Sequence, residues 1–122
     1  MDEHHDAASR DVRRPIDSLI SKSEKAQRRL TPGTWQHTML RDNLKALRIA
    51  VVLMDDPAGD ASGFAVDDLR DAVRALTSMM SRTEQAQRAF VSGTSQHTLL
   101  TNRLAALRVA ESLVADALQR RA

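Results

Sequence analysis

The chain contains one short stretch twice: GTWQHTML at Gly33–Leu40 returns as GTSQHTLL at Gly93–Leu100. When residues 18–54 are aligned with residues 78–114, 18 of the 37 aligned positions are identical. A repeat of this length within one chain indicates two copies of one supersecondary unit. The fold prediction therefore starts from the unit that this stretch belongs to.

The composition predicts a helical protein. Apolar residues make up 42% of the 122 residues, yet there are only one Trp, two Phe and no Tyr, so the core must be aliphatic. Leu, Met and Ala favour helices, and the length is typical of one compact domain. The sequence has no cysteine, no apolar run long enough to span a membrane and no secretory signal pattern, so a cytoplasmic protein without a membrane partner is expected.

Apolar residues recur at helical spacing in both copies. In the second copy one series runs from Val66 to Phe90 and another from His97 to Leu118, with alternating steps of three and four residues. The first copy has matching series from Ile16 to Leu30 and from His37 to Met54. Such steps mark one face of a helix, so four amphipathic helices are predicted.

The connection within each copy ends in glycine. Gly33 and Gly93 suit the left-handed position after a helix, and Thr34 and Thr94 suit the N-cap of the next helix. Connections this short make the two helices antiparallel neighbours. We therefore predict an all-α, up-down-up-down four-helix bundle made of two tandem duplicated αα-hairpins with pseudo-twofold symmetry.

The predicted domain organisation follows from the repeat. A polar N-terminal tail at 1–8 is expected to be disordered, and 9–122 is expected to form one four-helix domain. Hairpin repeat 1 spans 9–54 and hairpin repeat 2 spans 64–122. The Pro, Gly and Asp content of DDPAGDASG at 55–63 is typical of a linker.

Polar residues replace leucine in the seam near each turn. Gln27 and His37 each lie five residues from Pro32, and Gln87 and His97 occupy the same places in the second copy. Because an up-down-up-down bundle brings both turns to one end, these four side chains are expected to form one polar layer. The candidate ligand-binding residues are Gln27, Arg28, His37, Gln87, Arg88 and His97, flanked by Glu24, Thr34, Gln36, Glu84, Thr94 and Gln96.

Two interpretations of this layer involve no chemistry. In the structural one, the amides and imidazoles fix the helix register through hydrogen bonds, and the glutamate and arginine four residues apart in each copy form surface ion pairs. In the other, the layer binds a small anionic ligand. His37 and His97 fall in the first turn of their helices, where free N–H groups and the helix dipole favour negative charge. The arginines would add further donors.

The rival class uses the histidines chemically. QHTML and QHTLL resemble the His-Thr-Leu-Lys-Gly motif of histidine phosphotransfer domains, which are also four-helix bundles of about this length. The resemblance covers the His-Thr pair and a leucine, while Thr101 and Asn102 stand where the motif has Lys and Gly. It implies a phosphocarrier acting through His37 or His97. A mixed His/Glu metal site is the variant, but the chain has no Glu-x-x-His or His-x-x-x-His pair.

The distribution of surface charge indicates which partners the protein could bind. The formal net charge is +2, and the first copy carries a basic outer face. Weak nucleic-acid binding through this face is an alternative, but acidic residues interrupt it and no nucleic-acid-binding motif accompanies it, so nucleic acid is not the expected partner. The basic face consists of Lys22, Lys25, Arg29, Arg41, Lys45 and Arg48.

A homodimer is expected because the apolar stripes are wider than one seam, with Leu19, Met39, Val52 and Leu53 at their edges. Trp35 is expected to cover the end of the bundle, with a partner contact as the alternative. No nucleophile–histidine–acid set and no glycine-rich phosphate loop is present, so no catalytic residue and no cofactor is predicted. The predicted function is a non-enzymatic interaction or small-ligand-binding module.

Overall fold

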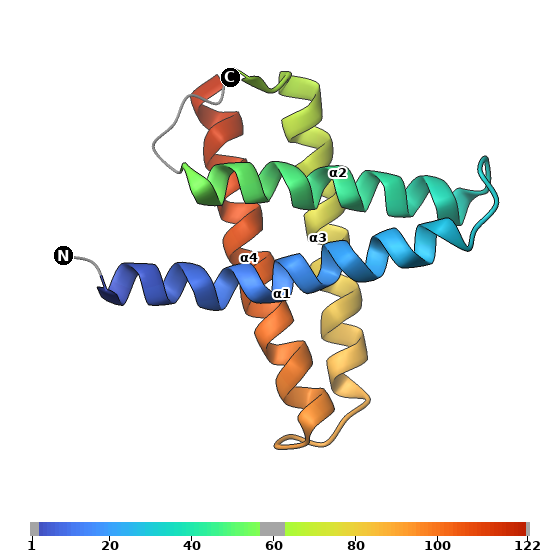
Figure 1. Cartoon of the computed structure of the whole chain (residues 1–122), viewed down its shortest axis with the longest axis vertical. Helices are drawn as coiled ribbons and strands as arrows, with labels where there is room; N and C mark the ends of the chain where they lie inside the picture. Colours follow the sequence, from blue (N-terminus) through green and yellow to red (C-terminus); the bar gives the residue numbers. More distant parts are fainter. Residues whose placement is uncertain (1–2, 57–62, 122) are drawn as a thin grey trace.

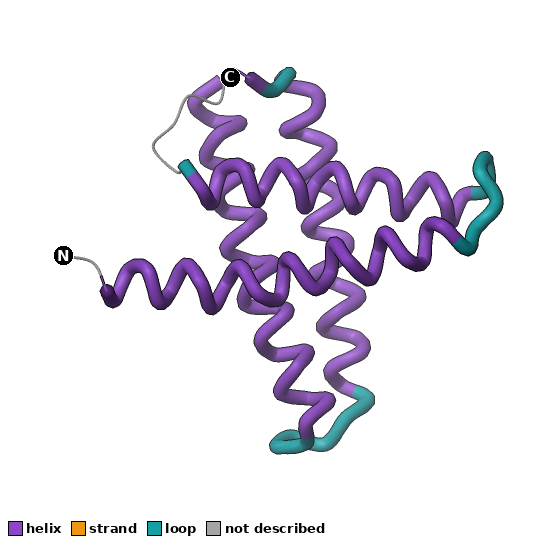
Figure 2. The backbone as a smooth tube through the Cα atoms, viewed as in Figure 1, coloured by secondary structure: helices purple, strands orange, loops and turns teal. Residues whose placement is uncertain are grey.

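The computed structural model describes residues 3–56 and 63–121, with side chains from Val12 onward, and within these ranges the chain forms four helices and no strand. Helix α1 pairs with α2 in hairpin 1, and α3 pairs with α4 in hairpin 2 (Figures 1 and 2). The predicted all-helical fold of four helices is confirmed. The helices are α1 (Glu3–Arg28), α2 (Trp35–Asp55), α3 (Val66–Arg88) and α4 (Ser95–Arg121).

The structure describes part of the predicted N-terminal tail and part of the predicted linker. The backbone of α1 is already helical from Glu3, inside the stretch 1–8 for which a disordered tail is predicted. Of the predicted linker, Asp55 closes α2 and residues 57–62 lie outside the described ranges. No helix in the described part of the chain has the length and apolarity needed to cross a membrane.

Local chemistry forms the two turns as predicted. Gly33 and Gly93 have φ angles of 93° and 92°, a left-handed conformation that glycine adopts without a steric penalty. The hydroxyls of Thr34 and Thr94 accept hydrogen bonds from the backbone N–H three residues on, at 3.3 and 3.2 Å. Each hydroxyl also donates to the carbonyl three residues back, at 2.8 Å in both turns. Both N-caps and both left-handed glycines are therefore confirmed.

The two hairpins cross each other. Figure 1 shows hairpin 1 lying across hairpin 2, with the two turns at the ends of different arms of a cross. Helix α2 packs on α3 and α4, and α1 packs on α4. This differs from the predicted up-down-up-down arrangement, in which both turns lie at the same end.

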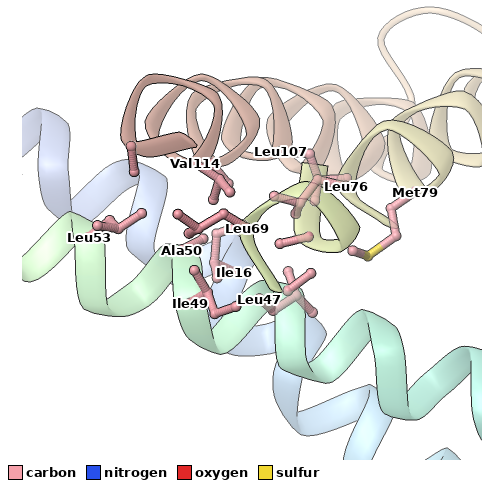
Figure 3. Close-up of a cluster of buried hydrophobic side chains, with 14 of the residues drawn as sticks. Ile16, Leu47, Ile49, Ala50, Leu53, Leu69, Leu76, Met79, Leu107 and Val114 are labelled. Carbon is pink, nitrogen blue, oxygen red and sulfur yellow. The ribbon is translucent and has the colours of Figure 1, made fainter. Parts of the chain in front are cut away.

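The core lies where the hairpins cross. Leu47 of α2, Leu76 of α3 and Leu107 of α4 are 0% exposed and belong to one apolar cluster (Figure 3). Between residues 21 and 42, in contrast, no residue is fully buried. The cluster also contains Ile16, Ala46, Ile49, Ala50, Leu53, Leu69, Ala72, Met79, Ala106, Ala110, Val114 and Ala117.

Side-chain size and polarity explain the crossing. Ala46, Ala50, Ala106 and Ala110 are at most 1% exposed, and their small side chains let the helix backbones approach closely. Toward each turn the seam carries glutamine and histidine, so those halves offer less apolar surface to bury. The hairpins therefore pack through their linker-side halves. The parts beyond the crossing project as arm 1 (21–42) and arm 2 (81–102).

Substitution within α4 tests this placement of the core. Leu107→Ala should lower the free energy of unfolding by about 2–5 kcal/mol, because it leaves a cavity at the crossing. Leu99→Ala is the matched control on the same helix, since Leu99 is 52% exposed, and should change it by about 0.5 kcal/mol or less. Urea unfolding measures both, and equal effects would contradict the core described above.

Candidate functional site

The residues of the predicted polar layer are divided between the two arms. Gln27 and His37 lie in arm 1, and Gln87 and His97 lie in arm 2, which extends in a different direction (Figure 1). All four side chains are half-buried. The crossing thus replaces the single predicted layer with two separate Gln–His pairs, one in each hairpin.

Hydrogen bonding within arm 2 differs from the expected amide–imidazole contact. The Gln87 side-chain Nε2 donates to the Thr101 hydroxyl at 2.6 Å, and this hydroxyl donates to the carbonyl of His97 at 2.9 Å. Arm 1 has Arg41 at the position of Thr101, and the Arg41 guanidinium lies 3.4 Å from Asp42. Gln87 therefore links α3 to α4 in a way that arm 1 does not repeat.

The flanking glutamates connect the helices of each hairpin. Arg48 donates to Glu24 at 2.8 Å, and Arg108 lies 3.8 Å from Glu84, the equivalent pair of the second copy. The predicted pairing of each glutamate with the arginine four residues on is replaced by these contacts across the hairpin. These ion pairs are partly exposed, so each contributes little stability, of the order of 0–1 kcal/mol.

The remaining candidate residues lie close to the turns. Arg28 and Arg88 are exposed in the last turns of α1 and α3, where the helix dipole favours a positive charge. Gln36 is half-buried, Gln96 is exposed, and the two threonines serve as N-caps. The arginines are thus the accessible charged groups among the candidates near each turn.

Few side chains that could bind a metal ion or exchange a proton lie near His37 and His97. Within the ranges that the structure describes, no group of three or more His, Cys, Asp or Glu side chains could hold a metal ion. The imidazoles of His37 and His97 make no described hydrogen bond, although their backbone N–H groups are held by the N-cap threonines. The candidate site can therefore offer hydrogen-bond donors and positive charge, but it shows no paired acid and base.

Sequence reasoning missed an open groove between α2 and α3. The groove has a volume of about 790 Å³. Trp35, in the first turn of α2, is 70% exposed and lines it, so the indole does not cover the end of a bundle. The groove is also lined by residues of α2, among them Met39, Asp42 and Lys45, and by Asp68, Asp71, Ala72, Arg74, Ala75, Ser78 and Arg82 of α3. The sequence signal for this groove is the spacing of its α3 residues, which recur every three or four positions and therefore share one face of the helix.

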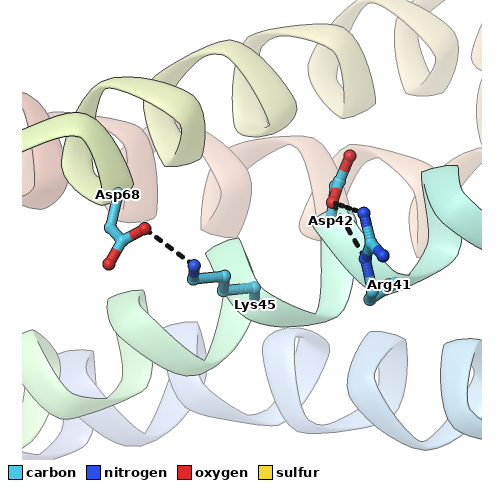
Figure 4. A network of polar contacts seen from close by, with 4 residues as sticks. All are labelled: Arg41, Asp42, Lys45 and Asp68. Atoms are coloured by element: carbon cyan, nitrogen blue, oxygen red, sulfur yellow. Dashed lines mark hydrogen bonds and ion pairs between the residues drawn. The ribbon is translucent and has the colours of Figure 1, made fainter.

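Two polar pairs lie at the groove, and one of them connects its two walls (Figure 4). Lys45 of α2 donates to Asp68 of α3 at 2.7 Å, and Arg41 pairs with Asp42 nearby. The hydrogen bond to Asp68 raises the pKa of the Lys45 ammonium above its usual value. This ion pair joins α2 and α3 at the linker-side end of the groove.

The four residues expected to promote association have different environments. Leu53 is 4% exposed and Leu19 packs against the core, so both serve the monomer. Val52 is 52% exposed, and Met39 is half-buried in the groove wall. Only the last two remain accessible to a partner.

Comparison with known proteins gives no relative from which a function could be transferred. No protein-family model, curated protein or solved structure matches the chain. Function is therefore inferred from the residues of this chain.

Substitution of the two N-cap threonines, one in each arm, tests whether the arms are separate. Thr34→Ala and Thr94→Ala should each lower the free energy of unfolding by about 0.5–2 kcal/mol, because each removes the acceptor of a helix-start N–H. In the double variant the two losses should add to within about 0.5 kcal/mol, since the arms share no contact partner at these sites. Urea unfolding measures the three variants. Thr77→Ala, at an exposed position within α3, is the control, and strong coupling between the caps would argue that the turns are neighbours.

Proposed function

We propose that the protein is a non-enzymatic interaction module and that arm 1 binds an acidic segment of a protein partner. The observation that supports this most is a set of exposed cations near the end of α1. We refer to Lys22, Lys25, Arg28 and Arg29 as the α1 cation group. A positively charged arm that projects from the core is accessible to an acidic partner from several sides.

The α1 cation group has no neutralising partner among the described residues. The one acid within it, Glu24, is already bound by Arg48 of α2. In contrast to the α1 cation group, the other cations of the predicted basic face each pair with a carboxylate. The α1 cation group is therefore the part of this face whose positive charge remains available. These pairs are Arg41 with Asp42, Lys45 with Asp68 and Arg48 with Glu24, at 3.4, 2.7 and 2.8 Å.

The arrangement of the group favours a short acidic segment. Lys22 and Lys25 are three residues apart on α1, and Arg29 follows four residues later, directly after the last residue of the helix. The equivalent positions of the second copy hold Arg82, Gln85 and Ala89, so that copy lacks the row. Four cations are also fewer than the roughly 6–10 phosphate contacts typical of strong nucleic-acid binding.

In this proposal the Gln–His pair of arm 1 has a supporting role. Gln27 and His37 are half-buried in the seam between α1 and α2, and the ion pair of Glu24 with Arg48 joins the same two helices. Both features lie where α1 packs against α2. The cation group is then presented on a paired helix, which lowers the entropy cost of binding relative to a flexible tail.

Neutralising the row tests the proposal. The probe is a fluorescein-labelled oligo-glutamate, and the variant carries Lys22→Gln, Lys25→Gln and Arg29→Gln. Its affinity for the probe should fall by roughly tenfold at low salt, because three favourable charge interactions are lost. The affinity of the unsubstituted protein should fall as salt is added. Fluorescence anisotropy measures the binding.

A control variant with the same change in net charge carries Arg70→Gln, Arg74→Gln and Arg108→Gln, at cations that already pair with carboxylates. It should bind the probe nearly as tightly as the unsubstituted protein. Equal losses in both triple variants would contradict a specific role for the α1 cation group. Tighter binding of a single-stranded oligothymidylate than of oligo-glutamate would replace the protein partner by a nucleic acid.

A further inference from the structure

The wall of the α2/α3 groove that α3 provides has an ordered charge pattern. Asp68, Asp71, Ala75, Ser78 and Arg82 line the groove in steps of three, four, three and four residues. Acidic side chains stand near the start of the helix, small side chains in the middle and Arg82 near the far end of the wall. Arg74 also lines the middle of the wall, and its guanidinium lies 3.9 Å from the Asp71 carboxylate. From Asp68 to Arg82 the helix rises about 21 Å.

The charges at the two ends of this wall are incompletely matched within the chain. The Arg82 guanidinium contacts the Ser78 hydroxyl at 3.2 Å and the Met39 sulfur at 2.9 Å, and no described carboxylate pairs with it. Asp68 uses Oδ1 for Lys45 at 2.7 Å, while its Oδ2 has no described hydrogen bond. The groove thus has an arginine without an acid at one end and an available carboxylate oxygen at the other.

We propose that the groove holds α3 of a second copy of this chain, antiparallel to the first α3 about a twofold axis beside Ala75. Asp68 and Arg82 lie equally far in sequence from Ala75, seven residues on either side. Arg82 of each copy therefore faces Asp68 of the other copy. A twofold interface requires such self-complementarity, and the order of acid, small residue and base meets it only when the helices are antiparallel.

The centre and the mouth of the groove suit a helix. Ala72, Ala75 and Ser78 are small, so a second helix can approach closely at the axis. Trp35 projects at the mouth with 70% of its surface exposed, and Figure 1 shows α2 running on past α3 toward its turn. A helix in the groove lies under arm 1 and covers the indole. The apolar contact then supplies affinity, and the ion pairs set the register.

This inference is independent of the α1 cation group, because none of those four cations lines the groove. It also assigns a role to the single tryptophan. Since Trp35 reports on the groove alone, its fluorescence follows occupation of the groove directly.

Sedimentation velocity of the full chain, from about 1 to 100 µM, tests the dimer. We expect a dimer and a blue shift of the Trp35 emission as the concentration rises. Arg82→Glu should weaken the dimer by at least about tenfold, because it places a carboxylate opposite Asp68. Arg88→Glu is the matched control: it makes the same charge change on α3 at an exposed residue outside the groove, and the dimer should persist.

A mixture of two variants tests the register. Arg82→Glu alone and Asp68→Arg alone should each be mainly monomeric, whereas the two together should form a heterodimer, because each introduced charge then meets its opposite. Circular dichroism establishes that both variants fold. A wild-type monomer at every concentration, a dimer unaffected by Arg82→Glu, or a mixture that stays monomeric would overturn the proposal.

Discussion

The apolar seam of each hairpin stops short of its turn, and the architecture depends on this constraint. Near the crossing, Leu47 and Leu107 are fully buried and small alanines allow close packing. Toward the turns, Gln27, His37 and their counterparts take the seam positions, so an extended side-by-side contact of the hairpins would bury polar groups that need partners. Crossing confines the contact to the apolar halves and leaves each turn on a projecting arm.

Both proposed surfaces follow from this geometry. Arm 1 extends beyond the core, and its two acids, Glu24 and Asp42, already pair with arginines of α2, so the α1 cation group is not neutralised within the arm. Helix α2 of the same hairpin passes α3 and forms one wall of the groove, with Trp35 at its mouth. The cations lie near the end of α1, whereas the groove lies between α2 of hairpin 1 and α3 of hairpin 2. The two proposed binding events therefore use separate surfaces.

Local features were predictable from the sequence, and the relation between the hairpins was not. Gly33 and Thr34 act only on their neighbours, so their roles could be derived from residue type and position. The spacing that contains Leu47 identifies which face of a helix is buried, but it does not identify the helix that covers that face. Hence the prediction placed His37 and His97 in one layer. The spacing of Asp68 and Arg82 was also visible, but the crossing was needed to show that this face stays open.

The crossing itself is tested most directly by the distance between the two turns. The chain has no cysteine, so spin labels can be attached through Thr31→Cys and Ser92→Cys, at exposed residues in the turns. Diluting the labelled protein with unlabelled protein restricts electron–electron resonance to distances within one chain. Each turn lies about 20 Å along its helices from the crossing, so we predict a distance above about 25 Å. A distance of roughly 10–15 Å, as between neighbouring helices of a side-by-side bundle, would contradict the crossed arrangement.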